Sequence, residues 1–333
     1  MSIPIRPTLL PAPDYLADLI ERVSLATTRI VIVTMVFHND SERMETLVRA
    51  LCDAVERGVT VVMGADSFTY LEPNSPWRRF IRGQSSQAYR ALRVAQRLKS
   101  SGVQFRWLGR HANVGVMGRT HAKWSIVDDT VYSFGGVNLY LMGVENTDYM
   151  FRITNKELAD ILSERFEWLM HSDRGNHAGR NRIVTLSSKT RIILDGGIPF
   201  NSKIYSRAIE LSKQADEILF VSQYCPTGRL ASILHQKKSR LYFNHWEDAG
   251  ALNTFVIRAG MHSSKLSTSY KRDPYLHAKF IIFTMPDGKK VALTGSHNFA
   301  AGGVMLGTRE ICLETTSEVI IGQLEAFFES SIK

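Results

Sequence analysis

One short pattern of residues occurs twice in this chain, and the duplication constrains the fold more than any other feature of the sequence. The first copy is His121-Ala-Lys123, followed by Asp128 and then by Gly135-Gly136-Val137-Asn138. The second copy is His277-Ala-Lys279, followed after a longer interval by Gly295-Ser296-His297-Asn298. In each copy an apolar, β-rich run follows the lysine, and a turn leads to a second such run. We therefore expect two similar hairpins, each of which returns an Asn to the edge where its His and Lys begin.

The second half of the sequence looks like a shorter version of the first. Each half opens with a helix-like stretch and then a continuous apolar strand, which suits a sheet that is buried on both faces. We expect helices at 15–24, 41–56 and 204–214 and strands at 29–37, 59–63, 103–108 and 217–224. The alternation of strand and helix predicts an α/β fold of two pseudo-symmetric halves, each with a mostly parallel central sheet flanked by helices.

The predicted halves cover residues 1–171 and 189–333, and a polar segment at 172–188, rich in Gly, Asn, Arg and Ser, is the predicted linker. The N-terminus lacks a signal pattern, and the longest apolar run, residues 30–37, is too short to span a bilayer. We therefore expect a cytoplasmic protein that is soluble or peripheral to a membrane.

The three cysteines are too far apart for a disulfide framework or a zinc site. They are Cys52, Cys225 and Cys312, and no Cys-x-x-Cys spacing occurs. We expect neither a metal nor a cofactor.

The repeated pattern resembles the signature of the phospholipase D superfamily, His-x-Lys-x4-Asp-x6-Gly-(Gly/Ser)-x-Asn, present twice. The first copy matches at every position, whereas the second has Thr284 where the family has Asp. The resemblance covers both halves. It implies the phospholipase D-like fold, with the active site at the junction of the halves, and cleavage of phosphodiesters through a phosphohistidine.

The chemistry of that reaction explains the residue types. A phosphodiester repels nucleophiles and has a poor leaving group, so covalent catalysis divides the displacement into two easier steps. Histidine suits both the nucleophile and the acid because its pKa lies near neutrality. By the resemblance, His121 is the nucleophile and His277 the general acid and base, although the near symmetry of the halves leaves their order open. The residues assigned to the phosphoryl oxygens are Lys123, Lys279, Asn138 and Asn298.

Several further residues are expected to support this site. Ser296 adds a hydroxyl where the first copy has Gly136. Asp148 and Glu310 follow the two asparagines at similar distances, and family members carry an acid there. They are candidates to fix the tautomer of each histidine, with ordinary surface acids as the alternative.

We expect a structural role for Asp128, which would hold its own hairpin in place. The corresponding loss at Thr284 is then either tolerated or offset by Asp287 in the following turn.

The net charge of +9 is unevenly distributed, since residues 73–127 contain no Asp or Glu. Such a block attracts anions. It is either the solvated face of an amphipathic helix or a docking surface for anionic lipid or a single nucleic-acid strand. The arginines proposed for docking are Arg78, Arg79, Arg82, Arg90, Arg93 and Arg97.

The complete first copy, followed by an acid, looks like the cardiolipin synthase and phosphatidylserine synthase branch of the family. We therefore predict hydrolysis or phosphatidyl transfer on phospholipids, at an anionic membrane surface. The alternatives are a metal-independent nuclease acting on DNA or RNA, and an inert homologue that binds phosphate or lipid. Both copies lie in one chain, so a monomer can be active.

Overall fold

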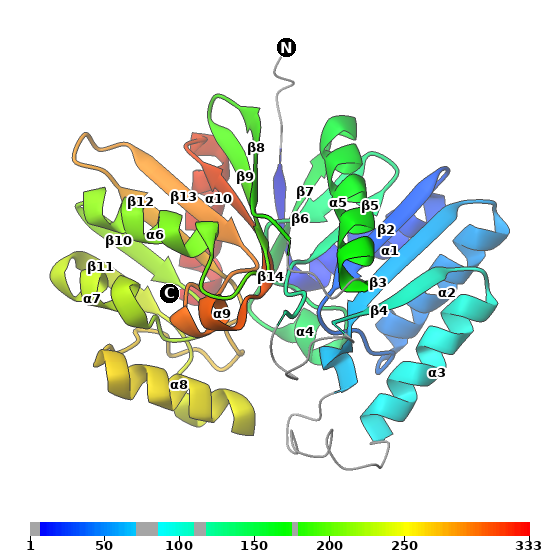
Figure 1. Cartoon of the computed structure of the whole chain (residues 1–333), viewed down its shortest axis with the longest axis horizontal. Helices are drawn as coiled ribbons and strands as arrows, with labels where there is room; N and C mark the ends of the chain where they lie inside the picture. Colours follow the sequence, from blue (N-terminus) through cyan, green and yellow to red (C-terminus); the bar gives the residue numbers. More distant parts are fainter. Residues whose placement is uncertain (1–6, 71–85, 110–117, 175–178) are drawn as a thin grey trace.

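The chain folds into two seven-stranded sheets that form the two halves of the molecule (Figure 1). The computed structural model describes residues 7–70, 86–109, 118–174 and 179–333. The strands of the first half are β1 (Thr8–Pro11), β2 (Arg29–Thr34), β3 (Thr60–Asp66), β4 (Gln104–Leu108), β5 (Trp124–Val127), β6 (Thr130–Ser133) and β7 (Tyr149–Thr154). Its helices are α1 (Ala12–Leu25), α2 (Glu42–Glu56), α3 (Ser86–Ser100), α4 (Leu141–Glu145) and α5 (Lys156–Arg174).

The second half repeats this plan. Its strands are β8 (Arg182–Ser187), β9 (Thr190–Gly196), β10 (Glu217–Val221), β11 (Lys238–Tyr242), β12 (Phe280–Thr284), β13 (Lys290–Gly295) and β14 (Arg309–Thr315). Its helices are α6 (Lys203–Gln214), α7 (Gly228–Gln236), α8 (Ala251–Ser264), α9 (Ala301–Leu306) and α10 (Glu318–Phe327). The α/β class, the two halves and the helices and strands expected from the sequence are confirmed.

The prediction that each sheet is mostly parallel is wrong. The strand order is β1-β7-β6-β5-β2-β3-β4 in the first sheet and β11-β10-β12-β13-β14-β9-β8 in the second. Among the described strands, only β2 with β3, β3 with β4, and β10 with β11 pair in parallel. The motif hairpins cause the difference, because β5-β6 and β12-β13 enter the middle of each sheet and pair antiparallel with β2 and β10.

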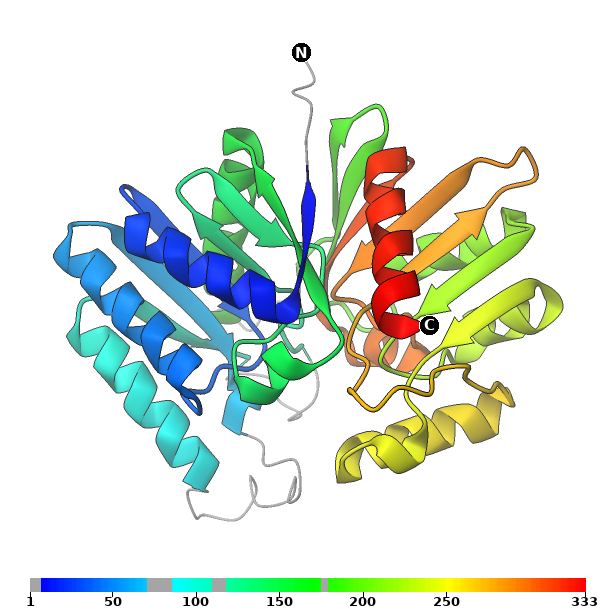
Figure 2. The same ribbon diagram turned by 180° about the vertical axis from the view of Figure 1, so that it is seen from behind.

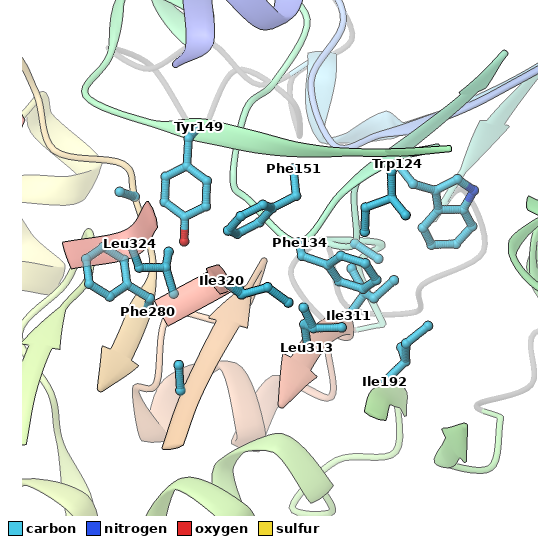
Figure 3. Packing of buried hydrophobic residues seen from close by; sticks show 14 of the residues in the cluster. Trp124, Phe134, Tyr149, Phe151, Ile192, Phe280, Ile311, Leu313, Ile320 and Leu324 are labelled. Carbon is cyan, nitrogen blue, oxygen red and sulfur yellow. The ribbon is translucent and has the colours of Figure 1, made fainter. Parts of the chain in front are cut away.

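Both faces of each sheet are buried, as the continuous apolar strands predicted. In β2, Ile30 and Ile32 face α1, α2 and α3, whereas Val31 and Val33 face the centre of the molecule. On the second sheet, α6 and α7 cover the outer face. The central layer contains α5 and α10 and joins the inner faces of both sheets in one apolar cluster. Figure 3 shows Tyr149 and Phe151 of the first half within this cluster, together with Phe280 of the second.

Local sequence signals set the ends of the outer helices. The Ser41 hydroxyl accepts a hydrogen bond from the Met44 backbone N–H and begins α2. Gly58, with a φ of 87°, follows the end of α2 and lets the chain turn into β3. In the second half Ser202 caps α6 in the same way, through the Tyr205 backbone N–H.

The predicted linker contributes to regular structure at both of its ends. Residues 172–174 complete α5, and β8 pairs antiparallel with β9 at the edge of the second sheet. The first described residues of the chain also contact its last long helix, since Gln323 on α10 accepts a hydrogen bond from the Leu9 N–H and donates one to the Pro7 carbonyl. The boundaries at residues 171 and 189 stay a prediction. Within the described residues, no helix combines the length and apolar character needed to cross a membrane.

Candidate active site

The two His-x-Lys segments lie directly before β5 and β12, in extended chain that crosses the junction between the halves. The backbone N–H groups of His121 and Ala122 both donate to the Arg309 carbonyl of the second half. The N–H groups of His277 and Ala278 donate in the same way to the Thr147 carbonyl of the first half. Each motif is therefore held by the opposite half, which fixes the histidines at the junction.

Each histidine also pairs with a carboxylate of the opposite half. Nδ1 of His121 lies 2.9 Å from Glu310 Oε2, and Nδ1 of His277 lies 2.6 Å from Asp148 Oδ2. All four side chains are buried. Each carboxylate accepts a hydrogen bond from the Nδ1–H group of its histidine, so Nε2 is left as the reactive nitrogen of each ring. The structure thus brings Asp148 and Glu310 to the positions expected of acids that fix the tautomers.

The two lysines occupy equivalent places. Nζ of Lys123 donates to the His121 carbonyl, and Nζ of Lys279 donates to the His277 carbonyl. Both side chains are buried. Burial lowers the pKa of Lys123 to about 7, with the neighbouring Lys279 charge adding to the effect. Burial likewise lowers the pKa of Lys279 to about 8. Two buried lysines close enough for the charge of one to lower the pKa of the other would attract an anion placed between them.

The same environment acts on the histidines. Burial lowers the pKa of His277 to about 3, and the Lys279 charge adds to this shift. Burial and the lysines also lower the pKa of His121, against the opposing effect of Glu310. Burial alone would raise the pKa of Glu310, but the His121 and Lys123 charges hold it at about 2. The acids therefore favour the ionised form, whereas burial opposes the charged form of each imidazole.

The small residues of each turn are required by the close packing of the backbone. A Cβ on Gly135 would lie 1.7 Å from the Tyr149 carbonyl oxygen, and one on Gly295 would lie 2.2 Å from that of Ile311. These carbonyls directly follow Asp148 and Glu310 in the chain. The turns therefore seat the two acids, which explains why the spacing from each turn to its acid is similar in the two halves.

The second small residue differs between the copies. A Cβ on Gly136 would lie 2.6 Å from Asp148 Oδ2 and 2.8 Å from Lys279 Nζ. The Gly136 backbone N–H instead donates to Asp148 at 3.1 Å. In the second copy the Ser296 hydroxyl donates to Glu310. Backbone and hydroxyl thus perform the same task, which is to hold the acid.

The asparagines have different partners in the two halves. Asn138 Oδ1 accepts from the Val36 N–H at 3.3 Å, which leaves its amide nitrogen available as a donor. The Asn298 carbonyl accepts from the Ser222 hydroxyl at 2.9 Å, and its Oδ1 is buried without a partner among the described residues. The expectation that both asparagines contact the phosphoryl oxygens stays a prediction.

Asp128 is structural, as expected. Its carboxylate accepts hydrogen bonds from the backbone N–H groups of Thr27, Thr28 and Arg29 and from both threonine hydroxyls, which fastens the β5-β6 turn to the start of β2. Burial would raise the pKa of Asp128, but these hydrogen bonds hold it at about 2.

The second half achieves the equivalent connection through the backbone. The Thr284 carbonyl accepts from the Asp216 N–H at 2.9 Å. The hydrogen bonds that the structure describes for the Asp287 side chain go to Lys289 within its own turn. They do not extend to the start of β10, so the suggestion that Asp287 replaces the missing acid is not supported.

Three of the arginines proposed for docking lie on α3 in the part of the chain that the structure describes, and their docking role stays a prediction. Arg97 pairs with Glu45 of α2 at 2.8 Å, so it ties two helices together. Arg93 lies over the Tyr89 ring at 5.8 Å, and Arg90 is exposed. Three of the arginines fall outside the described residues: Arg78, Arg79 and Arg82.

Comparison with known proteins agrees with this geometry. The sequence matches the family model described as cardiolipin synthase, PLD-like domain, over residues 19–170 and 205–332. The chain belongs to the phospholipase D superfamily. None of the curated proteins matches the sequence.

Two solved structures show the same fold as this phospholipase D superfamily member. Phosphatidylserine synthase from Haemophilus influenzae Rd KW20 has a TM-score of 0.74 and 14% identity, over 98% of this chain and 86% of that one. Polyphosphate kinase from Porphyromonas gingivalis has a TM-score of 0.61 and 11% identity, over 98% of this chain and 50% of that one. At such identities the likeness concerns the fold.

Sequence reasoning missed two buried ion pairs that support this phospholipase D-like site. Arg119, two residues before His121, pairs with Asp66 at 2.8 Å. Arg309, directly before Glu310, pairs with Asp173 at 3.1 Å. The charged residues at the ends of apolar strands, Asp66 in β3 and Arg309 in β14, could have predicted these pairs from the sequence, because a buried charge requires a partner. Among the described residues there is no cluster of three or more potential metal-ligating side chains.

Proposed function

We propose that this protein cleaves phosphodiester bonds of phospholipids through a covalent phosphohistidine and transfers the phosphatidyl group to water or to another alcohol. The observation that carries the proposal is the pair of histidines, each held at Nδ1 by a carboxylate of the opposite half. Two buried lysines beside them supply the charge that a phosphoryl group needs. The family match supports a lipid as the substrate.

In the first step Nε2 of His121 attacks phosphorus, and the bond from phosphorus to the leaving alcohol breaks. His277 gives its Nε2 proton to the leaving oxygen, so the alcohol departs neutral. The low pKa of His277 in the free site would oppose this role. The anionic substrate reverses part of that effect, because a negative charge beside the ring favours the protonated form.

In the second step a water or alcohol attacks the phosphohistidine. His277, now neutral, accepts the proton of the attacking oxygen as the bond from phosphorus to His121 breaks. Lys123, Lys279 and Asn138 would hold the phosphoryl oxygens in both steps and stabilise the charge of the transition state. The assignment of His121 as the nucleophile follows the family resemblance.

We also propose that the reaction takes place at the cytoplasmic surface of a membrane, where phospholipid is available. Since both motifs lie in one chain, a monomer contains all the residues of the proposed site.

The test gives the purified protein phosphatidylglycerol vesicles and, separately, labelled single-stranded DNA, in the presence of EDTA. His121→Ala and His277→Ala remove the proposed catalytic groups, and His171→Ala, an exposed histidine on α5, is the matched control. Lipid turnover that both active-site variants lose and the control keeps, with intact DNA, is the expected result. DNA cleavage with untouched lipid would contradict the proposal and favour the nuclease.

A further inference from the structure

Exposed apolar side chains are concentrated at one end of the molecule. Ten large apolar side chains are exposed among the described residues, and six of them lie on α3, α4, α8 and α9. In both ribbon views α4, α8 and α9 lie at the lower end, where α3 begins (Figures 1 and 2). These six side chains are Tyr89, Leu92, Met142, Phe255, Val256 and Met305. Most of the exposed large apolar side chains of the described residues therefore lie at this end.

Two helices of this end directly follow the candidate active site in the chain. Helix α4 begins at Leu141, three residues after Asn138, and α9 begins at Ala301, three residues after Asn298. Each motif turn thus leads directly into a short helix with an exposed methionine, Met142 in α4 and Met305 in α9, which are 56% and 52% exposed. Met142 and Met305 are therefore close to the site in the chain.

Helix α8 is the most prominent part of this end. Phe255 is 73% exposed and Val256 is 43% exposed, although Ile257 beside them is fully buried. The helix is anchored on its inner side, since the Tyr224 hydroxyl donates to Asn253 at 2.8 Å. A Cβ on Gly260 would lie 3.3 Å from side-chain atoms of Cys225 and Thr227, so the helix packs closely against that segment. Phe255 is therefore held outward by a seated helix.

The charge within α8 and the segment that follows it has one sign, whereas Glu247 and Asp248 directly precede the helix and Asp273 follows the segment. Residues 249–272 contain four Lys or Arg and no Asp or Glu. Arg258 lies on the helix itself, with its guanidinium 5.0 Å from the centre of the Trp246 ring, and Lys265 forms the C-cap. Apolar side chains bordered by cations are typical of helices that lie in a bilayer interface.

We propose that α8, together with α4 and α9, docks this protein onto an anionic bilayer surface and so brings the active site to its lipid. The inference rests on the proposed function, because a phospholipid stays in the membrane and its phosphodiester has to be reached there. The apolar side chains would enter the boundary between headgroups and acyl chains, and Arg258 and Lys265 would meet lipid phosphates. A nucleic-acid strand fits less well, because Val256, Met142 and Met305 offer no ring for a base to stack on.

The experiment measures sedimentation of the full chain with vesicles of phosphatidylcholine alone and of phosphatidylcholine mixed with phosphatidylglycerol. The test variants are the double changes Phe255→Ser with Val256→Ser, and Arg258→Gln with Lys265→Gln. The matched control is Leu25→Ser with Val319→Ser, which removes two exposed apolar side chains, 70% and 65% exposed, on α1 and α10.

The wild-type chain is expected to bind the anionic vesicles more tightly than the neutral ones. Loss of Phe255 and Val256 is expected to weaken binding on the order of tenfold or more, because both lose apolar contact with the membrane. Loss of the two cations is expected to cost roughly fivefold per charge on anionic vesicles and little on neutral ones. The Leu25 and Val319 control is expected to bind as the wild type does.

Turnover of a short-chain phospholipid, dispersed as monomers, separates docking from chemistry. The Phe255 and Val256 variant is expected to lose vesicle turnover and to keep monomer turnover. Monomer turnover by a wild-type chain that does not bind vesicles would overturn the docking inference and leave the proposed function standing. Vesicle binding through α8 without turnover of either lipid would reject the function alone. If the wild-type chain forms a dimer and does not bind vesicles, and the Phe255 and Val256 variant is a monomer, the face joins two copies of the chain and the docking inference is wrong.

Discussion

Replacing Asp148 by Asn tests the proposed division of labour between the histidines. Asp148 Oδ1 accepts from the backbone N–H groups of Gly136 at 3.1 Å and Tyr149 at 2.8 Å, while Oδ2 faces Nδ1 of His277 at 2.6 Å. Asn preserves the volume and the two backbone bonds, so its amide nitrogen is placed against Nδ1. Two donors cannot share that contact, and the imidazole has to adopt the tautomer that carries its proton on Nε2.

The expected loss follows from the tautomer. A neutral ring protonated at Nε2 is a very weak acid, and it cannot accept the proton of the attacking alcohol in the second step. We expect kcat on an alkyl phosphodiester to fall about 10³–10⁴-fold, which is about 4–5.5 kcal/mol of transition-state stabilisation. Asp195→Asn is the matched control, because Asp195 is also a buried acid but its carboxylate caps α6 through Ser202 and the Lys203 N–H.

The decisive assay compares an alkyl leaving group with p-nitrophenolate, which departs without protonation. If His277 is the general acid, the Asp148→Asn variant is expected to keep the first step on the nitrophenyl ester, because nitrophenolate needs no proton to leave. The variant would then release a burst of about one nitrophenolate per site, followed by slow turnover. Glu310→Gln impairs the nucleophile His121 and is expected to lose the burst as well. The opposite pattern would reverse the two roles, and a loss below about tenfold in both variants would refute the reasoning on orientation.

Three further predictions concern the scaffold and the charge of the site. Asp128→Ala is expected to lower the free energy of unfolding in urea by about 1–3 kcal/mol while activity is retained, because the carboxylate holds only the β5-β6 turn; Asp129→Ala is its control. Gly295→Ala is expected to prevent stable folding or to lower Tm strongly, because its Cβ would lie 2.2 Å from a backbone carbonyl oxygen, whereas Gly302→Ala has open space and should leave Tm nearly unchanged. Affinity for dimethyl phosphate is expected to fall as the pH rises through about 7 to 8, because Lys123 and Lys279 lose their protons there and with them the charge that holds the anion. An affinity that isothermal titration finds unchanged from pH 6 to pH 9 would contradict this prediction.

The sequence determined the class of fold and the composition of the site. A continuous apolar strand such as residues 29–34 indicates that both faces of its sheet are buried. A duplicated His-x-Lys with a following turn indicates a duplicated hairpin. The glycines of those turns are explained by backbone contacts too close for any side chain, as at Gly135 and Gly295. The apolar run and the repeated motif can be recognised within a short stretch of sequence, whereas the reason for the two glycines needed the tertiary structure.

Only the tertiary structure decided which groups meet. Glu310 pairs with His121, 189 residues away, and Asp148 pairs with His277, 129 residues away, because each motif crosses to the opposite half. The mixed order of the sheets has the same cause, since a hairpin can insert beside any strand whose edge is free. The low pKa of Lys123 likewise arises from burial and from Lys279, 156 residues away. No local pattern carries that information, because the energies that decide it come from contacts between segments that are distant in the chain.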